Sequence, residues 1–292
     1  MSVAFSVQDL RFKYPSAKED TLKGISFEVK EGEIFGLLGP SGAGKSTTQK
    51  ILIKLLEDYK GSVKYFGKDL KDLGKSYYEE IGVGFEVPVH FSKLTALENL
   101  KFYSGFYKSK ADIRELMERV GLWEYRDKKV GEFSKGMKVR LNFVRALLNK
   151  PRVLFLDEVT NGLDPKNARI IKDMIAEYRK DGGTVFLSTH LMNDVEQLCD
   201  RIAFCVNGSL VEVSTPRELK LKYGKREVKV EYNENGNLST AVFSLDGIGE
   251  NEEFVNLLKS KQIETIHSGE TSMEEIFIIV TGVELNERTE AV

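Results

Sequence analysis

A glycine-rich segment near residue 40 constrains this sequence more than any other feature. Residues Gly39 to Ser46 follow the pattern G-x-x-x-x-G-K-[ST], which is typical of loops that hold nucleotide phosphates. Glycines let backbone N–H groups turn inward around the phosphates, and the following helix directs the positive end of its dipole toward them. The apolar run Ile34 to Leu38 predicts a buried strand before the loop, and a helix is expected from about Lys45 to Leu56. A chance glycine turn is rare in that context.

Each part of the loop has an expected task. Lys45 is suited to reach the β- and γ-phosphates, and the hydroxyl of Ser46 is suited to coordinate Mg²⁺. The candidate nucleotide contacts here are Gly39, Pro40, Ser41, Gly42, Ala43, Gly44, Lys45, Ser46 and Thr47. The loop predicts nucleotide binding but not the function, because kinases, GTPases and motor proteins share it.

Two carboxylates and a histidine follow other apolar runs. Val153 to Leu156 ends in Asp157 and Glu158, at the edge of a parallel sheet where α/β proteins bind ligands. Asp157 is suited to hold Mg²⁺, directly or through water, and Glu158 to polarise a water molecule for attack on the γ-phosphate. His190 follows the strand pattern 184–189 and is placed to contact the γ-phosphate. An acidic pair after a strand is otherwise often a helix start, and we expect structural roles for the remaining histidines, His90 and His267.

The rest of the chain predicts an α/β fold. Strand patterns alternate with helix patterns, which implies a parallel sheet. Residues 87–150 predict a helical insertion, with a capping box at Thr95 to Glu98. A change in composition near residue 224 separates residues 1–224 from 225–292, for which we expect a small α+β domain with a hairpin turn at Asn235-Gly236 and a polar tail. The other strands are expected at 3–14, 21–38, 62–66, 152–156 and 202–206, and helices at 165–180, near 193, at 252–260 and after Ser272.

Composition excludes several classes of protein. The formal net charge of −2 gives no basic excess for nucleic acid, so no nucleic-acid partner is expected. The two cysteines, Cys199 and Cys205, form no disulfide framework and are expected to be reduced. No apolar run reaches the roughly 20 residues of a membrane-spanning helix, and the N-terminus does not resemble a signal peptide. We therefore expect a cytosolic chain that reaches a membrane only through a partner.

These motifs, in this order, resemble the ATP-binding subunit of ABC transporters. The distinguishing segment is Phe133-Ser134-Lys135-Gly136-Met137, where that family has its signature loop, and Ser-Lys-Gly-Met is similar to the bacterial subgroup that exports drugs, polysaccharides and sodium. Ser134 can cap the helix that runs to Leu148, whose N-terminal amides form an anion site. The resemblance implies that Ser134 and Gly136 bind the γ-phosphate held by an opposite subunit, in a head-to-tail dimer.

Other segments agree with the resemblance, which is close over residues 3–220. Tyr14 matches the residue that stacks on adenine, and Asp164, in Asn161-Gly162-Leu163-Asp164, matches a loop that touches the partner's site. Ser272 to Phe277 resembles the end of many exporter subunits. The implied fold is a P-loop ABC-type ATPase, in which helices flank a mixed core sheet, with an antiparallel β subdomain, the helical insertion and the C-terminal α+β domain.

Two positions depart from the family. Glu86 stands where a glutamine normally contacts Mg²⁺ and senses the membrane partner; glutamate keeps an acceptor oxygen, adds a charge and loses the amide donor. We therefore count Glu86 with Ser46 and Asp157 as a candidate metal ligand. Val159 replaces the proline that usually follows the catalytic glutamate, and little effect on chemistry is expected.

The resemblance implies an ATPase subunit that powers a transporter, with ATP and Mg²⁺ as cofactors. The implied partners are transmembrane permease subunits and a second ATPase subunit, expected to be the same chain. The subunit is expected on the inner face of the cell membrane, with a short partner helix received near Glu86; export is the expected direction. The alternatives are a soluble ABC-type ATPase that acts on ribosomes or DNA, and a regulatory scaffold that barely hydrolyses ATP because of Glu86. For residues 101–110 we expect a solvated helix surface rather than a partner surface.

Overall fold

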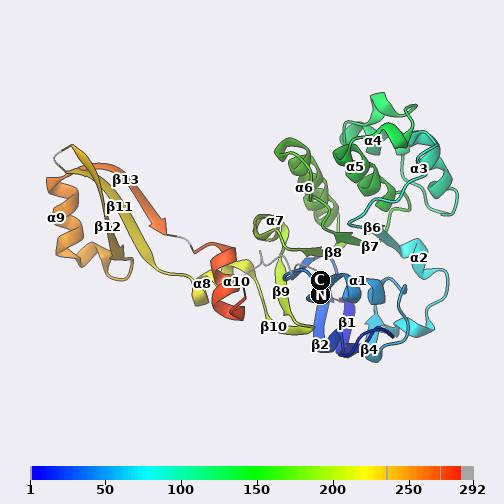
Figure 1. Cartoon of the computed structure of the whole chain (residues 1–292), viewed down its shortest axis with the longest axis horizontal. Helices are drawn as coiled ribbons and strands as arrows, with labels where there is room; N and C mark the ends of the chain where they lie inside the picture. Colours follow the sequence, from blue (N-terminus) through cyan, green and yellow to red (C-terminus); the bar gives the residue numbers. More distant parts are fainter. Residues whose placement is uncertain (1, 235, 270, 284–292) are drawn as a thin grey trace. The chain divides into compact units, whose positions relative to one another are not determined.

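The computed structural model describes residues 2–234, 236–269 and 271–283. The chain divides into two compact units, the first ending at Pro216 and the second comprising Arg217–Val283 (Figure 1). Lys225 N–H donates to Thr271 Oγ1 at 2.6 Å, which ties the beginning of the second unit to its last helix. The domain boundary predicted at 224/225 stays a prediction. Among the described residues, no helix is long and apolar enough to cross a membrane.

A mixed sheet forms the centre of the first unit. Its strand order is β10-β9-β3-β8-β7-β6, and all neighbours are parallel except β9 and β10. Every residue of the three central strands is buried, which explains why their sequences are nearly continuous apolar runs. The strands are β3 (Ile34–Leu38), β6 (Ile81–Gly84), β7 (Val153–Asp157), β8 (Thr184–Thr189), β9 (Arg201–Val206) and β10 (Ser209–Ser214).

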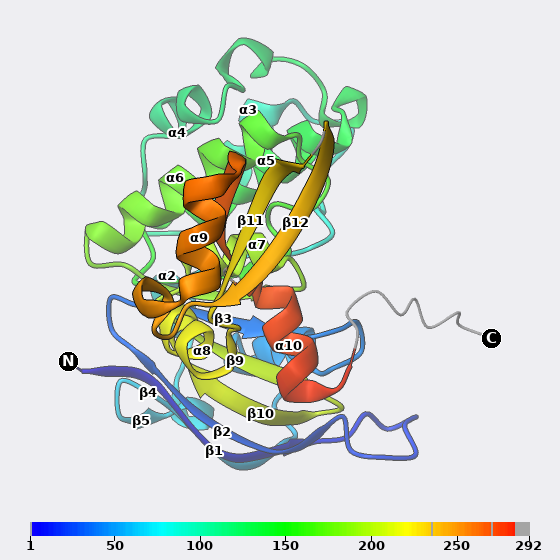
Figure 2. The ribbon, with the colours of Figure 1, turned by 90° about the vertical axis from the view of Figure 1, so that its left-hand side faces the viewer.

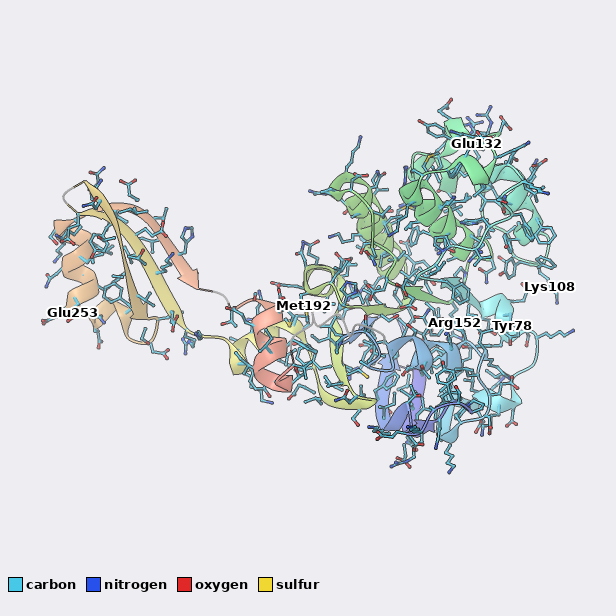
Figure 3. The ribbon with its side chains drawn as sticks, in the orientation of Figure 1. Tyr78, Lys108, Glu132, Arg152, Met192 and Glu253 are labelled. Atoms are coloured by element: carbon cyan, nitrogen blue, oxygen red, sulfur yellow. The ribbon has the colours of Figure 1, made fainter. Side chains whose placement is uncertain are left out.

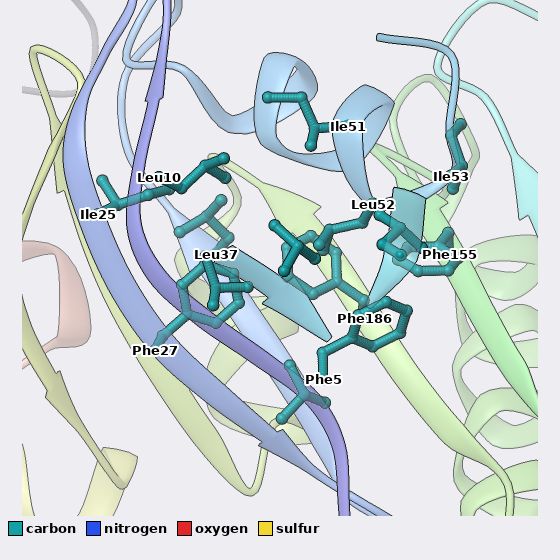
Figure 4. Packing of buried hydrophobic residues seen from close by; sticks show 14 of the residues in the cluster. Phe5, Leu10, Ile25, Phe27, Leu37, Ile51, Leu52, Ile53, Phe155 and Phe186 are labelled. Carbon is teal, nitrogen blue, oxygen red and sulfur yellow. The ribbon is translucent and has the colours of Figure 1, made fainter. Parts of the chain in front are cut away.

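An antiparallel sheet of order β2-β1-β4-β5 supplies the second layer. Its inward residues meet the mixed sheet through aromatic contacts: Phe27 stacks on Phe35 with 5.3 Å between ring centroids, and Phe5 meets Phe155 edge-on at 5.6 Å. Figure 4 shows this packing, with helix α1 above it. The strands are β1 (Val3–Phe12), β2 (Leu22–Lys30), β4 (Lys60–Tyr65) and β5 (Lys68–Asp69). These contacts fix the edge of the sheet that carries the glycine-rich loop.

The predicted helical insertion lies between β6 and β7. Its helices are α3 (Ala96–Ser104), α4 (Ile113–Arg119) and α5 (Lys135–Ala146), grouped together in Figure 1. Thr95 and Glu98 form the predicted capping box, and Asp112 and Ser134 cap the next two helices. The predicted α/β fold of ABC type, with its antiparallel β subdomain, is confirmed.

The remaining helices of the first unit are α1 (Lys45–Leu52), α2 (Tyr77–Glu80), α6 (Pro165–Lys180) and α7 (Met192–Leu198). Helix α6 has the predicted bounds because Asp164 caps it and Pro165 occupies its first turn. Helix α1 ends earlier than the predicted Leu56. Lys54 takes a left-handed conformation with φ 57°, and its ammonium donates to the carbonyl of Leu73 at 2.6 Å, which turns the chain away.

The second unit is an α+β structure. An antiparallel sheet of order β12-β11-β13 carries helix α9 along it, as Figures 1 and 2 both show. Phe243 of the sheet meets Phe254 of the helix edge-on at 5.3 Å. A capping box of Ser272 and Glu275 starts α10, as predicted. The predicted hairpin turn includes Asn235, and most of the polar tail is 284–292; both lie outside the described residues. The elements are α8 (Pro216–Tyr223), β11 (Glu227–Glu234), β12 (Asn237–Ser244), α9 (Glu252–Ser260), β13 (Gln262–Gly269) and α10 (Met273–Thr281).

Candidate functional site

A cavity of about 390 Å³ lies at the carboxyl end of the mixed sheet. It brings together most of the predicted site residues from segments far apart in the chain. Its lining consists of Tyr14, Thr21, Ser41, Gly42, Gly44, Lys45, Ser46, Thr47, Glu86, Asp157, Glu158 and His190. Of the other loop residues, Ala43 and Gly39 are buried behind this lining.

The glycine-rich loop runs from the end of β3 into α1. Gly44, with φ 107°, occupies the N-cap position, a conformation that strongly favours glycine. The backbone at Gly39 lies against β9, since a Cβ there would come within 2.0 Å of the carbonyl oxygen of Cys205. The thiol of Cys205 donates to the carbonyl of Ala43 at 3.0 Å, and Gly208 N–H donates to the same carbonyl at 3.0 Å. Strand β9 and its turn therefore hold the loop from behind.

Lys45 folds back over this loop. Its ammonium donates to the carbonyls of Gly39, at 2.7 Å, and Pro40, at 3.1 Å. Burial lowers the pKa of Lys45, and the nearby carboxylates of Glu158 and Asp157 oppose that shift. A phosphate in the cavity offers the ammonium charged acceptors in place of two carbonyls.

Asp157 ends β7 and is held by the neighbouring strand. The hydroxyl of Ser188 donates to Asp157 Oδ1 at 2.6 Å and lies 2.9 Å from Oε1 of Gln49 on α1. These side chains are buried, so the carboxylate has a defined orientation at the edge of the cavity. Sequence reasoning missed Ser188 and Gln49; the signal available was a polar pair, Ser188-Thr189, at the end of an otherwise apolar strand.

Glu158 begins the turn after β7 with φ 49°, a positive value that is uncommon for a residue with a side chain. Three donors orient its carboxylate, one from Thr189 at the end of β8 and two from His190 just after it. Thr189 Oγ1 donates to Oε2 at 3.0 Å, while the backbone N–H and Nδ1 of His190 lie 3.0 and 2.8 Å from Oε1. The general base predicted from sequence and the predicted histidine are thus in direct contact.

Tyr14 and Glu86 both belong to the cavity lining. The Tyr14 ring packs edge-on against Phe12 with 4.8 Å between centroids, and its hydroxyl lies 3.3 Å from Thr47 Oγ1. A flat base can therefore stack on a ring that is already positioned. Glu86 follows β6, is exposed, and acts on the charge of Lys45 together with Asp157 and Glu158.

Three predicted contacts outside the glycine-rich loop, Ser134, Gly136 and Asp164, do not line this cavity. Ser134 caps α5 by accepting Met137 N–H at 3.2 Å, and Asp164 caps α6 by accepting Asn167 N–H at 3.1 Å. Ser134 and Asp164 are exposed, and Gly136 is partly buried beside Leu163. Hydrogen bonds from Asn167 lower the pKa of Asp164.

The remaining histidines and the cysteines lie outside the cavity lining. His90 is 3.1 Å from the carbonyl of Lys138, and burial lowers the pKa of His90 to about 4. His267 is an exposed residue of β13. Both cysteines are free and buried, and burial raises the pKa of Cys205 to about 11.

The glycine-rich loop, the carboxylates that end a buried strand and the helical insertion define a P-loop nucleotide hydrolase of ABC type. Comparison with known proteins agrees. Residues 22–161 match the ABC transporter family, and residues 226–270 match the fluoroquinolone efflux ABC transporter C-terminal domain. A fluoroquinolones export ATP-binding protein of Mycobacterium tuberculosis is 49% identical over 96% of this chain and 93% of its own length. The chain therefore belongs to the ATP-binding subunits of ABC transporters: it binds and hydrolyses ATP to power a transporter.

More distant relatives and solved structures support this assignment. The bacitracin transport ATP-binding protein of Bacillus licheniformis is 39% identical over 73% of this chain and 70% of its own length. The structure of an ATP binding subunit of an ABC transporter matches with a TM-score of 0.69 and 30% identity, covering 76% of this chain and 93% of that one. A dimeric ATP-binding cassette bound to ADP and Pi matches with a TM-score of 0.65 and 26% identity, covering 72% and 98%.

Proposed function

We propose that this chain drives drug export: two copies clamp Mg²⁺-bound ATP head to tail and pass their motion to a separately encoded membrane permease. The observation that carries the proposal is the single cavity that contains Lys45, Asp157, Glu158 and His190. In this proposal the chain is peripheral on the inner face of the cell membrane, held there by the permease.

Hydrolysis in this cavity needs an activated water molecule. Glu158 accepts the proton as the water oxygen bonds to the γ-phosphorus and the bond to the β-phosphate oxygen breaks. Because the carboxylate of Glu158 is acceptor-only when ionised, Nδ1 of His190 carries the proton in their contact. Nε2 of His190 is then the ring atom left for the γ-phosphate, and because phosphate oxygens only accept, Nε2 must also carry a proton in that contact. Lys45 offsets negative charge on the phosphates.

The donor set fits Mg²⁺. Asp157, Ser46 and Glu86 line the same cavity and offer oxygen atoms, which Mg²⁺ prefers. Among the described residues, no group of three or more His, Cys, Asp or Glu side chains is arranged to hold a metal by itself. This agrees with an ion that binds through one or two carboxylates, a hydroxyl, phosphates and water. When bound, Mg²⁺ neutralises charge on the phosphates.

The exposed signature segment supports a second copy of the chain. Ser134 is exposed at the N-terminus of α5, where its hydroxyl accepts Met137 N–H, and it lines no part of this chain's own cavity. A helix N-terminus favours a negatively charged ligand such as a phosphate. Asp164 is exposed as well. In a head-to-tail dimer these groups complete the cavity of the opposite copy, and a twofold axis forms two equal sites.

A second, apolar groove of about 280 Å³ is the proposed docking site of the permease. It lies between the mixed sheet and the helical insertion and is lined by Ile53, Leu55, Tyr78, Ile81, Gly82, Val83, Phe85, Tyr103, Tyr107, Arg145 and Ala146. The proposal thus departs from the sequence-based expectation of a purely solvated surface at residues 101–110, which supply Tyr103 and Tyr107. Leu55 is 58% exposed and Tyr78 43% exposed, so the groove presents apolar surface that a partner helix can cover. Figure 3 labels Tyr78 and Lys108 in this part of the unit, where Lys108 N–H donates to Glu79. A short apolar or amphipathic helix fits such a groove.

The cargo class rests on relatives. Both the near-full-length relative and the family matched by residues 226–270 are named for fluoroquinolones. We therefore include fluoroquinolone-like drugs in the proposal, with export as the direction of transport.

Copurification from mild detergent tests the proposal. A multi-span membrane protein is expected to accompany the tagged wild-type chain at about one to one, and Leu55→Glu is expected to lose it while still binding ATP. Leu221→Glu changes another exposed leucine, 70% exposed and on α8, and is the matched control. Copurification of soluble proteins or ribosomes alone would contradict the permease and favour a soluble ATPase.

A further inference from the structure

A buried carboxylate outside the ATP cavity joins three elements of the first unit. Asp194, on α7, is 7% exposed, and both of its oxygens have partners. The hydroxyl of Thr160 donates to Oδ2. The ammonium of Lys172, on α6, lies 3.1 Å from Oδ1 and also donates to Gln197 at 2.8 Å. Met192, labelled in Figure 3, is the first residue of α7.

These partners come from the two segments that leave the ATP cavity. Thr160 is two residues beyond Glu158, and Asp194 is four residues beyond His190. The segments after β7 and β8 are therefore connected twice: in the cavity by Glu158 with His190, and outside it by Thr160 with Asp194. The pair Glu158–His190 belongs to the cavity lining, where ATP is proposed to bind. The pair Thr160–Asp194 includes no residue of that lining.

Stability alone is a poor explanation of this cluster. A buried ion pair gains little over well-packed apolar residues of the same volume, because desolvation offsets most of the attraction. It does impose one geometry, since a displaced partner leaves a buried charge unsatisfied. Here the imposed geometry includes the loop 161–164, which starts at Thr160 and ends at the cap of α6, the helix that carries Lys172.

We propose that Asp194 is a positioning residue that makes the segment after His190 and the loop 161–164 move as one body. The inference rests on the proposed head-to-tail dimer, in which that loop faces the second copy. A rearrangement of His190 around ATP is then transmitted through α7, Asp194 and Thr160 to the surface offered to the partner. Coupling of this kind needs a physical connection whose position both sites affect, and the cluster supplies one.

The test uses the full-length chain with Thr160→Val, which keeps the shape of the side chain but removes its hydroxyl. In the Glu158→Gln background, we expect ATP-dependent dimerisation, followed by analytical ultracentrifugation, to weaken about tenfold, within the range typical of coupling between sites. ATP affinity at dilutions where the chain is monomeric is expected to stay within about twofold. With Glu158 intact, kcat should fall by a similar factor with little change in KM. Thr160→Ser should restore each property.

Asp173→Asn is the matched control, since Asp173 is an exposed carboxylate of α6 that pairs with the exposed Arg169 at 3.8 Å. Lys172→Met provides a second route if Thr160→Val fails to fold, and the same pattern is expected. Equal dimerisation of Thr160→Val and its parent would overturn the inference, as would a parallel loss of monomer ATP affinity. If the Glu158→Gln parent itself does not dimerise with ATP, the proposed function fails and this inference fails with it.

Discussion

One carboxylate oxygen of Glu158 receives two contacts from a single residue, the backbone N–H of His190 at 3.0 Å and its Nδ1 at 2.8 Å. With Thr189 on the other oxygen, the carboxylate is oriented by groups at the end of β8. The base and the histidine are therefore positioned together before any substrate arrives. Substrate binding needs to redirect an imidazole that is 39% exposed rather than rebuild the site.

Replacing the carboxylate of Glu158 by an amide should separate binding from hydrolysis. Glu158→Gln keeps the size of the side chain but removes the base, so kcat is expected to fall about 10²- to 10⁴-fold. ATP affinity should change little, and ATP should trap a dimer. Phosphate release and sedimentation measure the two effects, with Glu57→Gln as an exposed control. A variant that stays monomeric with saturating ATP would count against a self-sufficient homodimer.

Subunit mixing tests the head-to-tail arrangement. Lys45→Ala and Ser134→Arg should each be nearly inactive alone. If each ATP contacts Lys45 of one copy and Ser134 of the other, a mixed dimer has one site with both changes and one with neither. In an equal mixture, half of the dimers are mixed and each of these has one intact site. About a quarter of all sites should therefore be intact, and ATPase activity should recover to about a quarter of wild type. Absence of any recovery, with mixed dimers shown by differential tags, would argue that both groups act on ATP in the same copy.

Glu86 should make nucleotide binding depend strongly on Mg²⁺. Its charge lies in the same cavity as the phosphates and, without the ion, repels them. Glu86→Gln is therefore expected to bind ATP about three- to tenfold more tightly in EDTA, and within about twofold of wild type with Mg²⁺. Titration with a fluorescent nucleotide gives both affinities, and Glu132→Gln is the control. Equal affinities of the two proteins in EDTA would show that the charge of Glu86 does not act on the phosphates.

The ring of Tyr14 should contribute to affinity through stacking rather than through its hydroxyl. Tyr14→Ala is expected to weaken ATP binding about three- to tenfold, which corresponds to about 0.5–1.5 kcal/mol for an aromatic contact. Tyr14→Phe keeps the ring and should remain within about twofold, because the Thr47 contact at 3.3 Å is long. If Tyr14→Phe weakened ATP binding by more than about twofold, the hydroxyl rather than the ring would make the main contribution.

His90 should make the stability of the first unit depend on pH. Burial lowers its pKa from 6.5 to about 4, so the unfolded chain binds a proton more readily than the folded one between these values. The stability that His90 contributes is complete above pH 6.5 and is lost as the pH falls toward 4. In urea unfolding, His90→Gln should flatten the dependence on pH in that window, with His267→Gln as the control. Identical slopes for wild type and His90→Gln would contradict the prediction.

Local patterns were sufficient for much of the fold. Asp164 with Pro165 marks the start of α6, and Thr95 with Glu98 marks the start of α3, because caps and first turns are interactions between near neighbours. The continuous apolar run of β7 likewise predicted a strand buried on both faces. The resemblance to ABC transporters added the antiparallel sheet and the signature segment.

Contacts between segments far apart in the chain could not be predicted from local sequence patterns. Ser188, which holds Asp157, and Gln49, which contacts Ser188, are 139 residues apart, and no local pattern relates them. Thr160 and Asp194 are likewise brought together only by the packing of α7 and α6. The left-handed turn at Lys54, which shortens α1, depends on a carbonyl at Leu73. Contacts of this kind can be identified only from the tertiary structure.

The burial of both cysteines has a practical consequence for following this motor at work. Thiolates are the reactive form of cysteine, and burial raises the pKa of Cys199 as well as that of Cys205. Maleimide and methanethiosulfonate reagents should therefore leave the two natural cysteines of the folded chain unmodified. Single cysteines introduced at exposed positions would carry spin labels or fluorophores without removal of the natural thiols. The natural sequence can therefore carry such labels directly, and they would report how fast two copies close on ATP.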